Sequence, residues 1–201
     1  MEVTEVVLAD DHPFMRIGIR NILNKTGDIS VIGEASDGIE ALWITQELEP
    51  DILLLDMEMP GMLGLEVTQE LQKAGCEIPV LAISAHDEKH FIFGMLLNGA
   101  AGYIVKDEIP ETLIKAIRSI AKGQRGWVSP RVAALLGIWM KEENPETVNL
   151  TTSDLQLLEL IAMGKQSEEI GAVLGESSKE VEEKLNKAVR IVRSRLNGKE
   201  E

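Results

Sequence analysis

The chain has 201 residues, of which 44% are apolar, and it carries a formal net charge of −14 at pH 7. This length and composition allow a sizeable buried core and one or two domains. The acidic balance is the reverse of the basic surface typical of nucleic-acid-binding proteins, and it argues against that class unless a segment departs from the average.

The acidic excess is concentrated in the N-terminal part of the chain. Residues 1–122 contain 9 Lys and Arg against 21 Asp and Glu, whereas residues 150–201 contain 8 against 10. Cys76 is the single cysteine, which excludes an intramolecular disulfide and fits a reducing cytoplasm. The first residues lack the basic charge of a signal peptide, and glycines interrupt the longest apolar stretch, 91–105. We therefore expect a cytoplasmic protein with no membrane span.

Short β-branched or Leu-rich runs alternate with stretches of helical period along the first 122 residues. The predicted strands are 5–9, 29–35, 51–56, 78–84 and 102–105, and the predicted helices are 13–25, 38–48, 64–74, 87–97 and 110–122. Such alternation is typical of a parallel sheet covered by helices on both faces. The run ILLLD is apolar at consecutive positions, as a strand buried from both sides should be. The predicted fold is an α/β domain with a doubly wound, five-stranded parallel sheet.

The pattern changes after residue 122. Glycines and prolines in 123–149 predict a linker, within which RVAALLGIWMK forms a short helix. Residues 150–201 are predicted to form a small all-α domain of three short helices. The candidate N-caps of these helices are Thr152 or Ser153, Ser167, and Ser177 or Ser178.

Several polar residues follow the predicted strands. Asp10 and Asp11 come after the first strand, Asp56 ends the third, and Lys106 follows the fifth. Because the carboxyl ends of parallel strands share one edge, we expect these side chains to converge. Three carboxylates in one pocket repel each other unless a hard cation such as Mg²⁺ lies among them. A carboxylate beside Mg²⁺ and a lysine is suited to accept a phosphoryl group, for which Ser84 supplies a hydroxyl.

Four stretches resemble, in order and spacing, the signature stretches of bacterial response-regulator receiver domains: LADDHPFMRIGI, LLLDMEMPGMLGLE, AISAHD and GYIVKD. The resemblance covers essentially all of residues 1–122 and implies a flavodoxin-like receiver of a two-component system. It implies that Asp56 is the phospho-acceptor for a partner histidine kinase. It also implies that the chain is no stand-alone enzyme, because the receiver's chemistry is limited to phosphoryl acceptance and autodephosphorylation.

The same resemblance implies the metal ligands. Asp11 would bind Mg²⁺ directly, Asp10 largely through water, and Asp56 and the backbone carbonyl of Glu58 would complete the protein ligands. One departure from the pattern is Leu63, where close relatives usually have Asp, but this position lies outside the phosphate site.

The resemblance also implies a switch. Ser84 would move toward the phosphate, Lys106 would pair with it, and Tyr103 matches the switch aromatic, with an ordinary core tyrosine as the alternative. The expected consequence is a change in the face formed by the fourth and fifth helices and the fifth strand. That change would lead to a phosphorylation-dependent homodimer or to release of the output domain.

Residues 150–196 resemble the helix-turn-helix output domain of the NarL/FixJ subfamily, also called the LuxR type. The residues that carry this resemblance are Leu150, Thr151, Leu158, Ile161, Ala162, Gly164, Glu169, Ile170, Leu174 and Val181. They are packing and turn positions, so they support the predicted fold and not a particular function. By resemblance, the function of this domain is to regulate transcription by binding DNA.

The stretch KEVEEKLNKAVRIVRSRL occupies the position of the recognition helix. An apolar stripe of helical period leaves a polar face, whose candidate DNA-facing residues are Lys179, Glu182, Glu183, Asn186, Lys187 and Arg190. A recognition helix contacts bases with its N-terminal residues. Acidic residues occupy this end, where the subfamily is more basic: Glu180, Glu182 and Glu183. Glu168 stands at the start of the preceding helix, where the subfamily usually has a basic residue.

Two hypotheses for the output therefore stay open. The fold and the later basic residues favour a transcription regulator that binds DNA. The acidic residues favour a domain that has lost DNA affinity, because glutamates repel phosphates, and that acts through protein contacts instead. Reversing the charge of Glu168 and Glu182 discriminates the two.

Overall fold

The computed structural model describes residues 3–142 and, beyond them, 153, 156, 157, 160, 165, 167–181, 183 and 184. The strands are β1 (Thr4–Ala9), β2 (Ile29–Ala35), β3 (Ile52–Asp56), β4 (Val80–Ser84), β5 (Gly102–Val105) and β6 (Trp127–Val128). The helices are α1 (Pro13–Leu23), α2 (Gly38–Leu48), α3 (Gly64–Lys73), α4 (Lys89–Leu97), the 3₁₀ helix η1 (Lys106–Glu108), α5 (Ile109–Ala121), α6 (Pro130–Glu142) and α8 (Ser167–Leu174).

All pairings in the sheet are parallel, and the strand order is β2-β1-β3-β4-β5-β6. The chain moves outward from β1 to β2, crosses back to β3 and then continues in the other direction. This doubly wound order confirms the predicted α/β fold. It also places the switch point between β1 and β3, which is where such sheets bind their ligands.

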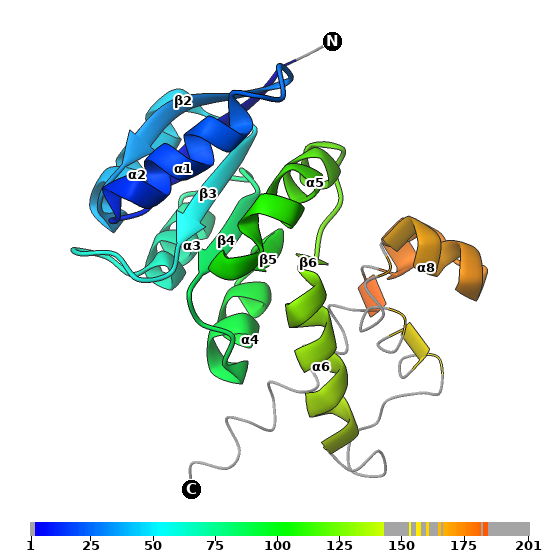
Figure 1. The fold of residues 1–201 in the computed structure, drawn as a ribbon. Coiled ribbons are helices and arrows are strands. Elements are labelled where there is room, and N and C mark those ends of the chain that lie inside the picture. The colour runs from blue at the N-terminus through cyan, green and yellow to red at the C-terminus, as the bar shows by residue number, and fades with distance from the viewer. Residues whose placement is uncertain are drawn as a thin grey trace, which may run out of the picture.

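Helices cover both faces of the sheet, and the apolar residues divide accordingly (Figure 1). Along β3, Ile52 and Leu54 belong to the cluster under α1 and α5, whereas Leu53 and Leu55 belong to the cluster under α2, α3 and α4. Successive side chains of a strand point to opposite faces. The consecutive apolar positions of ILLLD are therefore explained by burial on both sides.

The structure adds a sixth strand to the five that were predicted. β6 pairs with β5 through Gly102 and Tyr103, and a Cβ atom on Gly102 would lie 2.6 Å from the carbonyl oxygen of Trp127. Glycine therefore permits this close approach. A strand of two residues carries no periodicity, so the hydrophobic pattern could not reveal it.

The helix inside the predicted linker packs on the receiver. α6 contacts α4 and β5, and it buries Val132, Ala133 and Leu136 (Figure 1). The ring of Trp139 lies 5.8 Å from that of Phe93 on α4. The helix is thus attached to the outer end of the sheet by apolar contacts.

Parts of the C-terminal segment are also described. α8 is followed by Gly175, whose φ of 72° is the left-handed conformation that commonly ends a helix. Residues 178–181, 183 and 184 are helical. Ser177, directly before them, and Glu180, in their first turn, bond reciprocally as in a capping box. The buried side chains of Leu157, Ile170 and Val181 come from three separate helical stretches.

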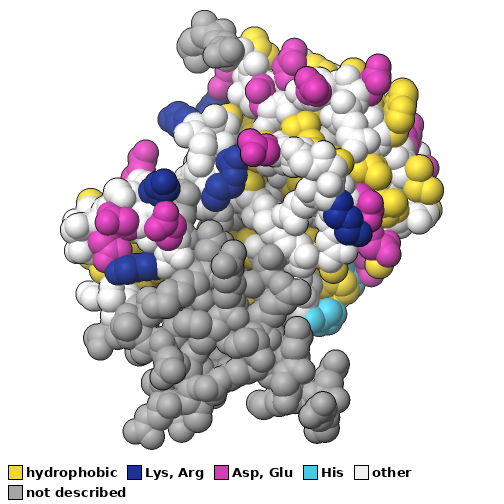
Figure 2. Space-filling view, turned by 180° about the vertical axis from the view of Figure 1, so that it is seen from behind, with side chains coloured by type: hydrophobic (Ala, Val, Ile, Leu, Met, Phe, Trp, Pro, Cys, Tyr) yellow, Lys and Arg dark blue, Asp and Glu magenta, His cyan; other side chains and the backbone are white. Residues whose placement is uncertain are grey.

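The surface in Figure 2 shows acidic and hydrophobic side chains side by side over much of the receiver. Phe14 is 88% exposed and Trp43 is 62% exposed. No helix among the described residues combines the length and the apolar character that crossing a bilayer requires.

We predict that Leu54→Ala lowers the free energy of unfolding by about 2–5 kcal/mol, because a fully buried leucine leaves a cavity between the sheet and its helices. Urea denaturation followed by circular dichroism measures the change. Leu63→Ala is the control: its side chain is 52% exposed, so the effect should stay within about 0.5 kcal/mol. Equal effects of the two substitutions would contradict the assignment of the core.

Candidate functional site

Aspartates and a lysine meet at the carboxyl edge of the sheet. Asp10 and Asp11 directly follow β1, Asp56 is the last residue of β3, and Lys106 follows β5. β1 and β3 are neighbours, but β4 separates β3 from β5. Lys106 therefore has to reach across the end of β4, and its long flexible side chain is suited to that span.

The lysine ammonium group is shared by two carboxylates. Lys106 Nζ lies 2.6 Å from Asp56 Oδ2 and 2.8 Å from Asp10 Oδ2. The side chains of Asp10 and Asp56 are 1% and 5% exposed, and that of Lys106 is 12% exposed. Buried charges are tolerated only when they are paired, so the three groups hold one another in place.

Opposing effects act on the protonation of this group. Burial raises the pKa of Asp56, the hydrogen bond from Lys106 lowers it in part, and the charge of Asp10 raises it further. Burial alone would lower the pKa of Lys106, but the hydrogen bonds to Asp10 and Asp56 more than offset this, so its pKa is raised. Lys106 is therefore a permanent cation at neutral pH, and ionised Asp56 is held against a desolvation penalty.

The donor set fits a hard divalent cation. Ligand atoms of Asp10, Asp11, Asp56 and His12 all lie within 4.8 Å of one another. Lys106 supplies one positive charge against three carboxylates, so the remaining negative charge favours a bound cation. Carboxylate oxygens are the ligands that Mg²⁺ prefers, and Asp11, at 30% exposure, is open to solvent.

His12 and the side chain of Glu58 were not singled out from the sequence. His12 is 71% exposed and its Nδ1 lies 2.6 Å from Asp11 Oδ1. Glu58 pairs through its carboxylate with His86, at 2.9 Å, whereas its expected role as a ligand concerned its backbone carbonyl. A histidine directly after two aspartates was the signal that could have identified His12.

His86 connects the loop after β4 to the site. Its backbone N–H donates to Ser84 Oγ over 3.0 Å, and its carbonyl oxygen accepts from the hydroxyl of Tyr103 over 2.9 Å. Its ring stacks on Phe91, with the centroids 4.4 Å apart. The hydrogen bond that the His86 ring donates to the Glu58 carboxylate raises the pKa of His86.

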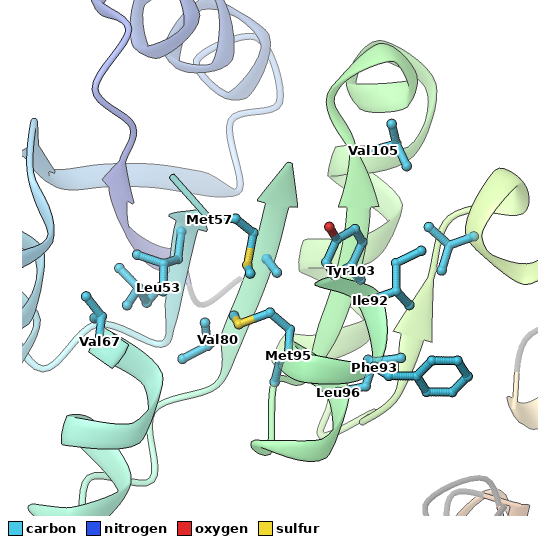
Figure 3. Close-up of a cluster of buried hydrophobic side chains, with 14 of the residues drawn as sticks. Leu53, Met57, Val67, Val80, Ile92, Phe93, Met95, Leu96, Tyr103 and Val105 are labelled. Carbon is cyan, nitrogen blue, oxygen red and sulfur yellow. The ribbon is translucent and has the colours of Figure 1, made fainter. Parts of the chain in front are cut away.

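Tyr103 lies fully inside the protein. Figure 3 shows its ring beside Ile92 of α4, with the hydroxyl directed toward the carboxyl end of β5. Burial raises the pKa of Tyr103 to about 12, so the hydroxyl stays protonated and acts as a donor. The core packing matches the alternative reading of this residue, while its expected role as a switch stays a prediction.

The candidate DNA-facing residues are only partly described. Lys179 and Glu183 are exposed, as are Glu168 and Glu180. The remaining candidates lie outside the described residues: Glu182, Asn186, Lys187 and Arg190. The Glu180 carboxylate accepts from the N–H of Ser177, and this bond lowers the pKa of Glu180.

Lys184 is turned toward its own segment. Its ammonium group lies 2.8 Å from Ser153 Oγ and pairs with Glu176. Lys184, one of the basic residues that follow the glutamates of the predicted recognition helix, thus has partners within the protein.

Comparison with known proteins agrees with this geometry. The sequence-family model named response regulator receiver domain matches residues 6–118. The oxygen regulatory protein NreC of Staphylococcus aureus is 36% identical over 186 residues, which cover 89% of this chain and 86% of that protein. The signal receiver domain of the putative response regulator NarL from Mycobacterium tuberculosis is 40% identical, with a TM-score of 0.60, over 62% of this chain and 100% of that one. A DNA-binding response regulator of the LuxR family from Staphylococcus aureus is 26% identical, with a TM-score of 0.57, over 59% of this chain and 99% of that one.

An acidic pocket at the switch point of a doubly wound sheet, with a lysine reaching into it, defines a receiver domain. The chain is a response regulator of a two-component system. Within that class it belongs to the NarL/LuxR family, as its similarity to NreC over most of both chains indicates.

We predict that Asp56→Asn raises the free energy of unfolding at pH 7 in the presence of a chelator. Because the pKa of Asp56 is raised in the folded state, its ionised form destabilises the wild type above that pKa. The difference between variant and wild type should shrink as the pH falls through the folded pKa, and vanish below the unfolded pKa of about 3.9.

Urea denaturation at a series of pH values measures this difference. Asp51→Asn, directly before the same strand, is the control, because Asp51 is exposed and lies outside the buried group of Asp10, Asp56 and Lys106. A difference between Asp56→Asn and wild type that is independent of pH would contradict the burial argument.

Proposed function

We propose that the protein receives a phosphoryl group on Asp56 from a partner histidine kinase and, in response, regulates transcription by binding DNA. The shared Lys106 ammonium group between Asp56 and Asp10 is the observation that carries the first part. It leaves Asp56 as a buried carboxylate with a fixed cation beside it, as an acceptor of a phosphoryl group requires.

The transfer uses the groups of this chain as follows. An oxygen of Asp56 attacks phosphorus, an O–P bond forms, and the P–N bond to the donor histidine breaks. Lys106, 2.6 Å from Asp56 Oδ2, neutralises charge on the phosphoryl oxygens. Ser84 moves toward the new phosphate and donates its hydroxyl. Water later attacks the same phosphorus and restores Asp56, which limits the lifetime of the signal.

Mg²⁺ is the proposed cofactor, held by Asp10, Asp11, Asp56 and the backbone carbonyl of Glu58. When bound, it screens the repulsion between the carboxylates and the incoming phosphoryl group. Asp10 contributes largely through water, because its Oδ2 already faces Lys106.

The switch is proposed to involve the loops that follow β4 and β5. Ser84 and Lys106 are drawn inward by the phosphate, and the loop around His86, bonded to both Ser84 and Tyr103, moves with them. Tyr103 thereby senses the change, and a phosphorylation-dependent homodimer forms through the surface around α4, β5 and α5.

DNA binding is proposed for residues 150–201, which follow the receiver of 1–122 and the linker of 123–149. The similarity to NreC across most of both chains supports a shared domain organisation. Beyond the acidic start of the last helix, the basic residues Lys187, Arg190 and Arg193 can contact phosphates. The protein is proposed to act in the cytoplasm, where kinase domain and DNA are both accessible, and to be no enzyme beyond its own phosphoryl chemistry.

We predict that incubation with acetyl phosphate and Mg²⁺ adds one phosphoryl group to the wild type, measured by intact-protein mass spectrometry. The Asp56→Asn variant should gain no phosphoryl group, and the wild type should gain none when Mg²⁺ is omitted. Asp51→Asn, which removes a carboxylate from the same sequence neighbourhood, should be modified like the wild type. Modification of Asp56→Asn to the wild-type level would refute the assignment of the acceptor.

We further predict that beryllofluoride, a phosphoryl mimic on Asp56, strengthens binding of the full-length protein to sheared genomic DNA from its own source. The affinity should fall steeply with salt, because phosphate contacts release counterions. Lys187→Glu with Arg190→Glu should weaken binding by about tenfold or more at low salt, since two contacts become repulsive.

Lys122→Glu is the matched control for that experiment, because it reverses an exposed charge on the receiver and should leave binding unchanged. If the protein does not bind DNA at low salt although beryllofluoride occupies the site, the proposal that residues 150–201 act by binding DNA is wrong.

A further inference from the structure

Polar contacts tie the first turn of α6 to the receiver. The carboxylate of Glu108 accepts from the hydroxyl of Ser129 and from the backbone N–H of Arg131, the latter over 3.0 Å. The N–H of Ser129 also donates to the carbonyl oxygen of Tyr103 over 3.1 Å. Glu108 therefore satisfies helix N-terminal groups that α6 cannot satisfy itself.

The guanidinium group of Arg131 contacts the loop after β4 and the 3₁₀ helix η1. Its Nε donates to Asp87 Oδ2 over 2.9 Å, and its Nη1 lies 3.8 Å from Asp107 Oδ2. Asp87 is in the loop that follows Ser84, and Asp107 directly follows Lys106. The bridge thus contacts the two segments that carry the residues proposed to respond to phosphate.

A short chain of contacts leads from the site to this bridge. The N–H of His86, the residue before Asp87, is bonded to Ser84 Oγ, and Lys106 is bonded to Asp56. An inward movement of Ser84 and Lys106 therefore displaces both aspartates that face Arg131. Arg–carboxylate bonds depend on planar geometry, so small displacements weaken them.

The rest of α6 is held by packing at the same place. Val132, Ala133 and Leu136 are buried, and Trp139 contacts Phe93 on α4. In the described structure, α6 therefore covers part of the surface formed by α4 and β5 (Figure 1). A second protein surface can use that part only after α6 has moved.

We propose that Arg131 is a coupling residue that links the phosphate site to the linker helix. In the free protein its bridge to Asp87 and Asp107 holds α6 on α4 and β5. A phosphoryl group on Asp56 weakens the bridge, and α6 loosens and uncovers that surface. The direction of the change rests on the proposed function, whereas the holding role of Arg131 in the free protein does not.

Hydrogen exchange of the full-length protein, resolved by mass spectrometry, tests the holding role in the free state. Arg131→Gln should speed exchange of peptides from residues 133–142 by about two- to fivefold, the range expected for loss of one exposed ion pair, while β3 stays unchanged. Asp87→Asn removes the same bridge from the other side and should have the same local effect.

Arg118→Gln is the matched control. Arg118 on α5 pairs with Asp28, which precedes β2 at the opposite edge of the sheet from β6, and its side chain is 49% exposed, as is that of Arg131. Exchange in α6 that is the same for Arg131→Gln, Asp87→Asn and Arg118→Gln would overturn the proposal.

Addition of beryllofluoride and Mg²⁺ tests the coupling. The wild type should show faster exchange in α6, and Arg131→Gln, already loosened, should show a smaller further change. Fluorine NMR reports separately whether beryllofluoride is bound, with Asp56→Asn as the negative control. Bound ligand with unchanged α6 exchange would overturn the coupling and leave the phosphoryl acceptor intact. Absence of binding would instead overturn the proposed function, while the comparison in the free state would still decide the role of Arg131.

Discussion

The bond network around the Lys106 ammonium group is the constraint on which the site depends. Asp10 and Asp56 are buried, and neither carboxylate would be tolerated there in its ionised form without a cation. The sheet supplies the geometry, because β1 and β3 are adjacent and β5 is one strand farther away. The lysine side chain spans that gap. The pairing of the buried carboxylates with a cation therefore depends on the strand order.

The outer edge of the sheet connects this site with the remainder of the chain. β6 and α6 extend the receiver beyond β5, and the first turn of α6 is bonded to residues that follow the site lysine. The apolar side of α6 then packs on α4. The linker helix is thus bonded to the segments that border the phosphate site. These bonds can transmit a change at the site to α6.

Some charged side chains of the C-terminal segment stabilise its local structure. Glu180 bonds Ser177 at the start of a helix, and Lys184 pairs with Glu176. Acidic residues at a helix N-terminus are favourable by their interaction with the helix dipole. Part of the acidity of this segment therefore has a local structural reason, so net charge alone is a poor guide to whether the segment binds DNA.

The sequence by itself determined the parallel α/β fold and brought the site aspartates, Ser84 and Lys106 to notice. Long hydrophobic runs such as ILLLD report burial directly, and residues at strand ends share an edge whatever the side-chain details. Only the tertiary structure decided that β6 joins the sheet, that His12 lies among the aspartates and that Arg131 bridges Asp87 and Asp107. These features depend on contacts between segments far apart in the chain, and single polar residues or a two-residue strand carry no periodic signal from which such contacts could be predicted.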